Sequence, residues 1–161
     1  MGDLIRFKGG ENYIMNIFDI AKAFLSLDIM THKKLQKLCY YAQAWHLALF
    51  KEPLYKESLQ AWIHGPVCRD LYQEYKKYGW RKIPSEKKPC NVDGDTYEFI
   101  KEVYVTYGEL SGDELEMLTH EEEPWIEARG DLSSMEPSYE EIKLSTMQDY
   151  YWSVYEGGQN D

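Results

Sequence analysis

Histidine and cysteine are the residue types in this 161-residue chain that most often carry catalysis or bind metal, and it holds four histidines and three cysteines. His120 is followed by three glutamates and resembles the start of the helical zinc-protease motif His-Glu-x-x-His. Pro124, however, stands where that motif needs its second histidine. His46, His64 and Cys68 are the remaining candidate ligands, but they lack the close, repeated spacing of zinc sites. We therefore expect no metal site and no cofactor.

A cysteine nucleophile is the second chemistry to consider. Cys39 lies within an apolar helical stripe, where a thiol stays protonated and unreactive. Cys68 falls in the first turn of a predicted helix, where the helix dipole favours a thiolate. A small hydrolase that uses Cys68 with His64 or His46 is thus the enzyme alternative, and simple packing of the thiol is the other. The chain has no phosphate-binding glycine loop and no Gly-x-Ser-x-Gly elbow, so we expect no enzyme.

The clearest element is a helix over residues 31–50. Its apolar residues recur every three or four positions, as on one face of a helix, and Thr31 is placed to cap its start. Lys33, Lys34 and Lys37 fall largely outside this apolar stripe. The pattern predicts a central core helix.

The segment after this helix contains a possible partner-binding turn. Residues 58–63 fit either a short strand or a helical turn, and Pro66 predicts the start of a helix because proline suits the first helical position. Gly65 permits backbone angles that other residues avoid. The turn either docks a helix rigidly or presents Trp62 and His64 to a partner.

Further helices follow from apolar periodicity and from residues that favour helix ends. Their expected starts are Ile14, Asp95 with Glu98, Ser111 with Glu114, Pro124, and Ser145 with Gln148. Together these elements predict a mainly α fold: a single compact helical domain of about seven helices with at most a few short strands. We expect this domain to span residues 13–157, after a flexible leader over residues 1–12.

Charge and hydropathy narrow the possible partners. The chain carries 28 acidic against 18 basic residues, a net charge of −10, which disfavours nucleic-acid binding. Residues 109–127 hold eight acids and no Lys or Arg. This acidic run is either a solvated face or a surface on which Glu121, Glu122 and Glu123 attract a basic protein partner. The uncharged stretch over residues 38–50 is too short for a membrane span of about 20 residues, so we expect a soluble protein with no membrane partner. The three cysteines are too far apart and too few for a disulfide framework, and residues 1–6 lack an apolar signal run, so we expect a cytoplasmic protein.

Three blocks of residues, in a fixed order, resemble a known family. They are Leu35-Gln36-Lys37-Leu38-Cys39-Tyr40-Tyr41-Ala42-Gln43, Ala61-Trp62-Ile63-His64-Gly65-Pro66-Val67, and Leu118-Thr119-His120-Glu121-Glu122-Glu123-Pro124-Trp125. The ordered set resembles the Panacea domain of SocA-like antitoxins and of the phage-associated proteins called GepA. The resemblance covers roughly residues 15–130, which is most of the chain.

The resemblance implies a mainly helical antitoxin that neutralises a cognate toxin, encoded beside it, by direct binding. One branch of the family resembles a proteolytic adaptor that carries its toxin to a protease, and members also occur in prophages. The family supplies no catalytic residue, so the matched positions are interpreted as scaffold. These positions are Leu35, Lys37, Leu38, Tyr41, Ala42, Gly65, Pro66, Val67, Thr119, His120, Pro124 and Trp125.

Overall fold

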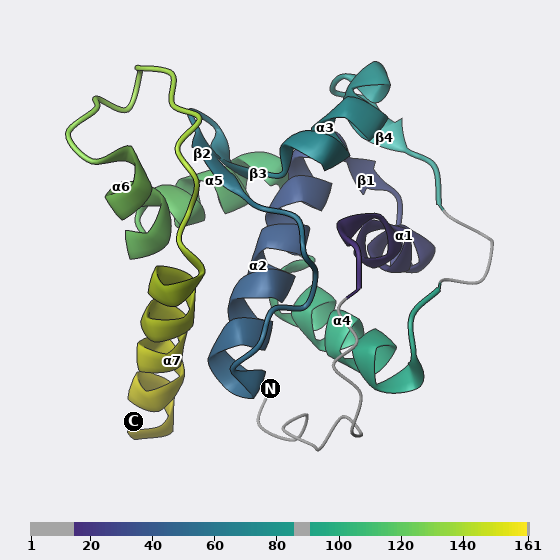
Figure 1. Ribbon diagram of the computed structural model, residues 1–161. Coiled ribbons are helices and arrows are strands. Elements are labelled where there is room, and N and C mark those ends of the chain that lie inside the picture. The colour runs from purple at the N-terminus through teal and green to yellow at the C-terminus, as the bar shows by residue number, and fades with distance from the viewer. Residues whose placement is uncertain (1–14, 86–90, 161) are drawn as a thin grey trace.

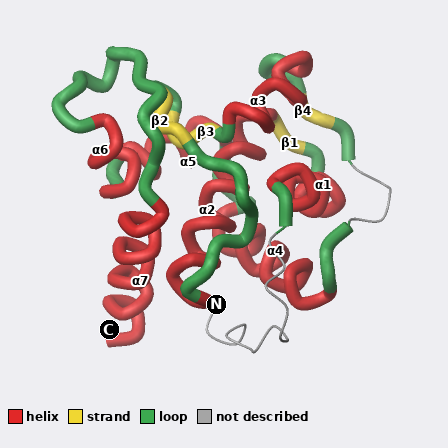
Figure 2. The backbone as a smooth tube through the Cα atoms, viewed as in Figure 1, coloured by secondary structure: helices red, strands yellow, loops and turns green. Residues whose placement is uncertain are grey.

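The computed structural model describes residues 15–85 and 91–160 (Figure 1). The predicted leader over residues 1–12 lies outside these described residues. More than half of the described residues are helical, and the strands there are only two or three residues long (Figure 2). The predicted mainly α fold is therefore confirmed.

Seven helices and four strands make up the described chain. The helices are α1 (Ile17–Leu27), α2 (His32–Phe50), α3 (Arg69–Tyr75), α4 (Gly94–Tyr107), α5 (Gly112–His120), α6 (Glu123–Arg129) and α7 (Leu144–Asn160). The strands are β1 (Met30–Thr31), β2 (Gln60–Trp62), β3 (Gly65–Val67) and β4 (Lys82–Ile83). They form two antiparallel pairs, β1 with β4 and β2 with β3.

Helix α2 runs through the centre of the molecule, with α1, α4, α5 and α7 packed on it (Figure 1). Thr31 caps its start as predicted, because the Thr31 hydroxyl accepts a hydrogen bond from the Lys34 amide at 3.2 Å. Every residue from Leu35 to Leu49 is buried, so this stretch has no solvent face. The prediction that Lys37 lies outside the buried stripe is therefore wrong: Lys37 is only 1% exposed.

The second sequence block forms a β-hairpin. The ambiguous segment 58–63 contains strand β2, which pairs with β3 so that Ala61 lies opposite Pro66. The predicted helix start at Pro66 is wrong, because the backbone angle that proline imposes suits an extended strand as well as a first helical turn. Helix α3 begins later, at Arg69, with Cys68 as its N-cap. A 3₁₀ turn over Lys76–Tyr78 then carries the chain to β4.

Two of the predicted helix boundaries are confirmed by local hydrogen bonds and angles. Ser111 and Glu114 form the reciprocal capping box of α5, with both backbone–side-chain bonds present. Helix α6 has Pro124 in its first turn and ends before Gly130, whose φ is +59°. These boundaries depend on the nearest residues alone.

Two other predicted caps are wrong by one or two residues. Asp93 rather than Asp95 caps α4, and its side chain accepts a backbone hydrogen bond at 2.7 Å. Asp95 instead lies in the first turn, where a negative charge is favourable beside the helix dipole. Ser145 lies inside α7, which already begins at Leu144.

Aromatic side chains fill the space between α2, α4 and α7. Tyr41 of α2 stacks on Tyr107 of α4, with 4.0 Å between ring centroids. The Trp45 indole N–H donates to the Tyr107 hydroxyl at 2.7 Å. The hydroxyl oxygens of Tyr40 and Tyr151 lie 3.0 Å apart and so join α2 to α7. Each ring buries apolar area while its polar group finds a partner.

Candidate functional site

The three sequence blocks meet at one buried lysine. Lys37 extends from α2 beneath the β2–β3 hairpin, where Gly65 has a φ of +105°. A Cβ atom on Gly65 would lie 2.5 Å from Lys37 Cε and 3.0 Å from the Thr119 hydroxyl oxygen. Glycine therefore fits here for two reasons: its backbone tolerates a positive φ, and it leaves room for the lysine stem.

Lys37 is almost completely buried, with 1% of its surface exposed. Its Nζ donates a hydrogen bond to the Pro66 carbonyl oxygen at 3.2 Å, the one hydrogen bond it makes within the described part of the chain. A lysine ammonium has three donors, so two remain unused. Burial lowers the pKa of Lys37 to about 7, with the positive charge of Lys33 lowering it further and Glu116 opposing the shift.

Gln36, the neighbour of Lys37, fixes the end of the hairpin. Its Oε1 accepts a hydrogen bond from the Cys68 amide at 2.9 Å, and its Nε2 donates to the Cys68 carbonyl oxygen at 3.2 Å. The prediction that Cys68 lies in the first turn of a helix is wrong, since it is the N-cap of α3. Burial raises the pKa of the Cys68 thiol, which favours the protonated, unreactive form.

Helices α5 and α6 support the hairpin from the side of the third sequence block. The ring of His120 stacks on Trp125, with 3.9 Å between centroids and 16° between planes. The Trp125 indole N–H donates to the Trp62 carbonyl oxygen at 2.8 Å, and Arg129 Nη1 donates to the Ala61 carbonyl oxygen at 3.1 Å. Burial lowers the pKa of His120, so its ring is neutral at pH 7.

A groove of about 300 Å³ opens beside Lys37, between α2, the hairpin and α3. The basic side chains in its lining are His32, Lys33, Lys37 and His64. Trp62 and Tyr72 form an aromatic wall, with 5.1 Å between their centroids. Among the described residues that line it, none is Asp or Glu, although the chain as a whole is strongly acidic. Burial lowers the pKa of His32 to about 4, so this ring is neutral at pH 7, and the groove combines two lysines with an apolar wall.

The basic side chains at the mouth of the groove already have acidic partners on α5. Lys33 Nζ pairs with Glu116 and, at 2.7 Å, with Asp113. His64 Nδ1 lies 3.2 Å from the other Glu116 oxygen. Lys37 has no ion pair within residues 15–85 and 91–160. Lys37 is thus the positive group of the groove that lacks a direct counter-charge.

The three consecutive glutamates of the third block lie in different environments. Glu121 and Glu123 are exposed. Glu122 turns inward, where its Oε1 accepts hydrogen bonds from the hydroxyls of Tyr41 at 2.6 Å and Tyr151 at 2.9 Å. Burial raises the pKa of the Glu122 carboxyl. Of the three, Glu121 and Glu123 are the ones that a partner would reach.

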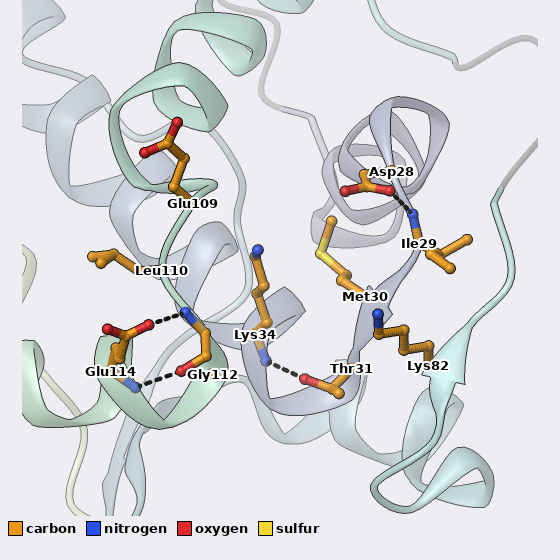
Figure 3. A pocket seen from close by; sticks show the side chains of 11 residues that line it. Asp28, Ile29, Met30, Thr31, Lys34, Lys82, Glu109, Leu110, Gly112 and Glu114 are labelled. Atoms are coloured by element: carbon orange, nitrogen blue, oxygen red, sulfur yellow. Dashed lines mark hydrogen bonds between the residues drawn. The ribbon is translucent and has the colours of Figure 1, made fainter.

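A second pocket, of about 320 Å³, lies where the N-terminal ends of α2 and α5 meet (Figure 3). Charges of both signs line it: Lys34 and Lys82 together with Asp28, Glu109 and Glu114. Lys34 Nζ donates to the Gly108 carbonyl oxygen, and Glu114 belongs to the capping box of α5. Lys34 and Glu114 thus bond to the backbone, so this part of the pocket resembles a structural junction.

Metal binding and membrane insertion find no support in residues 15–85 and 91–160. No group of three or more His, Cys, Asp or Glu side chains there is arranged to hold a metal ion, and no helix there is long and apolar enough to cross a membrane. His46, a ligand candidate, is buried with its Nδ1 2.7 Å from the Glu52 carbonyl oxygen.

The buried roles of Gln36 and Lys37 were not predicted from the sequence. The available signal was two adjacent polar residues inside an otherwise apolar helical run.

Comparison with known families agrees with this geometry. The family described as antitoxin SocA-like, Panacea domain matches residues 35–126, which is more than half of the chain and includes the blocks that meet at Lys37. Comparison with curated proteins finds no match, and neither does comparison with solved structures. The chain belongs to the SocA-like antitoxin family, and residues 35–126 are its Panacea domain.

Proposed function

We propose that this chain is the antitoxin of a toxin–antitoxin pair and that it neutralises a cognate protein toxin by binding it directly. The observation that carries this proposal is membership of the SocA-like family over residues 35–126. A binding role also agrees with the chemistry of the hairpin, because the Cys68 thiol is buried and its pKa is raised. The toxin is expected to be encoded next to the antitoxin and to meet it in the cytoplasm.

Trp62 and His64 are the proposed contacts at the hairpin. His64 is exposed, and Trp62 is half-buried between Tyr72 and Tyr139, with 5.9 Å between the centroids of Trp62 and Tyr139. Tyr139 itself is 66% exposed. Rigid aromatic side chains of this kind often carry most of the binding energy of an interface. The bond from Trp125 to the Trp62 carbonyl keeps this surface in place.

Glu121 and Glu123 are the residues proposed to attract a basic toxin electrostatically. Glu121 follows the last residue of α5 and Glu123 is the first residue of α6, and both are exposed next to the hairpin that α6 contacts. Complementary charge mainly raises the rate of association and selects partners, while packed aromatic anchors slow dissociation. A basic toxin would therefore be attracted by the glutamates and retained by the Trp62 surface.

Coexpression with the neighbouring gene tests the proposal. Growth should be rescued and a complex should copurify. Trp62→Ala should speed dissociation by about tenfold or more, as expected for an interface anchor. Reversal of Glu121 and Glu123 to Lys should slow association and weaken its salt dependence. The matched control reverses Glu98 and Glu102 of α4, which are exposed and change the net charge equally.

Two results would contradict sequestration by direct binding. One is a demonstrably toxic neighbour that forms no complex with this chain. The other is a toxin whose amount falls only when an intact cellular protease is present, which would favour the proteolytic-adaptor alternative. The half-life of the toxin, measured with and without this chain, therefore separates the two mechanisms.

A further inference from the structure

The groove beside Lys37 has the features of a site for a negatively charged side chain. Lys37 lies within it and uses one of three hydrogen-bond donors, and the described lining contains no acid. Burial lowers the pKa of Lys37 to about 7 because its positive charge is costly there, and a carboxylate from another molecule reduces that cost. The wall of Trp62 and Tyr72 supplies apolar area beside this charge.

We propose that the groove receives the side chain of an Asp or Glu residue of the protein partner, with its carboxylate directed at Lys37. This inference rests on the proposed function, because it specifies what the bound partner inserts. The volume of about 300 Å³ equals that of about ten liquid water molecules. It therefore accommodates an acidic side chain together with part of an adjacent apolar residue, which packs on Trp62.

The charges around the groove favour a single carboxylate over a polyanion. Asp113 and Glu116 stand beside Lys33 at the mouth, and the net charge of the chain is −10. A nucleic-acid strand brings many phosphates close to these acids and is repelled by them. One acidic side chain passes between them and meets Lys37 inside.

A pair of small probes tests this inference on the isolated full chain. Phenylacetate carries a carboxylate on an aromatic body, and phenylacetamide is its neutral analogue. In NMR titrations below the Lys37 pKa of about 7, phenylacetate should shift the Trp62 indole and Val67 amide signals. It should bind at least about tenfold more tightly than phenylacetamide, as expected for a charge-assisted hydrogen bond. Equal affinity of the two probes, or shifts that avoid both signals, would overturn the inference.

Two variants locate the charge that selects the carboxylate. Lys37→Met should abolish the preference for phenylacetate, whereas Lys82→Met removes a lysine outside the groove and should preserve it. If Lys37→Met does not fold, the affinities of the two probes for the natural chain still show whether the groove prefers a carboxylate. A Lys37→Met protein that folds and keeps the full preference would contradict the assignment.

The purified complex with the toxin distinguishes a partner side chain from a free carboxylate. Phenylacetate should no longer shift the Trp62 signal, because the toxin occupies the groove. Unchanged phenylacetate binding in the complex would overturn docking of a partner carboxylate. If the chain neutralises the toxin but binds phenylacetate and phenylacetamide equally, only this inference is contradicted. Probe selectivity in a chain that forms no toxin complex counts against the proposed function instead.

Discussion

Replacing Lys37 with Met tests the energetic cost of placing a lysine beneath the hairpin. Methionine keeps an unbranched stem of similar length, so the close approach to Gly65 is retained. The change removes the ammonium group and its hydrogen bond to the Pro66 carbonyl. The difference in unfolding free energy between the two proteins should therefore report the protonation of Lys37.

The pH dependence follows from two pKa values. The pKa of an unperturbed lysine is 10.5, and burial lowers that of Lys37 to about 7. Between these pH values the unfolded chain holds a proton that the folded chain has released, so the natural protein gains stability as pH rises. Each pKa unit corresponds to about 1.4 kcal/mol, and a difference of about 3.5 units to about 5 kcal/mol. The full cost is present below about pH 7.

Loss of the hydrogen bond partly offsets this gain for the variant. A buried hydrogen bond contributes about 1 kcal/mol, so Lys37→Met should be more stable than the natural chain near neutral pH by up to about 4 kcal/mol. Its advantage should shrink by about 1.4 kcal/mol per pH unit as pH rises. Above the pKa of unfolded lysine, the natural chain should be slightly the more stable of the two.

Urea unfolding of both proteins between about pH 7 and about pH 9 measures this change. Subtracting the two free energies at each pH cancels the titration of all groups that the proteins share. Lys82→Met, which removes an exposed lysine, should show a constant difference from the natural chain. A constant difference for Lys37→Met would refute the reasoning, because it would mean that Lys37 keeps its proton in the folded chain.

Three further predictions address other contacts. Gly65→Ala should destabilise the fold more than Gly130→Ala in urea unfolding, because a positive φ costs alanine about 1–3 kcal/mol at both positions, but only at Gly65 would the new Cβ also meet Lys37; equal costs would remove the steric argument. Cys68→Ala should still rescue growth in the coexpression assay, and loss of rescue by a folded variant would revive the hydrolase alternative. Glu122→Gln should be more stable than the natural chain at pH 7, because burial raises the pKa of this carboxyl. That advantage should disappear as pH falls toward the ordinary carboxyl pKa, and a difference independent of pH would contradict it.

Features that depend on neighbouring residues could be predicted from the sequence. The Thr31 cap and the capping box of Ser111 are bonds between residues three apart, so residue type and spacing suffice to recognise them. Proline at position 66 was ambiguous, because its fixed φ suits both a strand and a helix start. The pairing with β2 that decides between them lies outside this local pattern.

The environment of the charged residues could not be predicted in this way. A single apolar stripe on α2 predicts one buried face, but α1, α4, α5 and α7 together cover the helix on every side. Lys37 is buried for this reason, and its partner Pro66 comes from a distant part of the chain. Glu122 likewise belongs to an acidic run in sequence, yet tyrosines of α2 and α7 bind it. Recognising either residue required the tertiary arrangement.

The position of α7 has a consequence for transplanting the domain into other proteins. This helix lies beyond residues 35–126, yet its Tyr151 packs on Trp45, with 5.5 Å between ring centroids, and bonds to Glu122. A graft that carried only the family-matched segment would lack His32 and Lys33 of the groove and would expose the aromatic flank of α2 to water. Such a graft would also interrupt α2, which begins at His32. The smallest portable unit therefore extends through α7, and recombination among relatives should exchange α7 together with the Panacea domain.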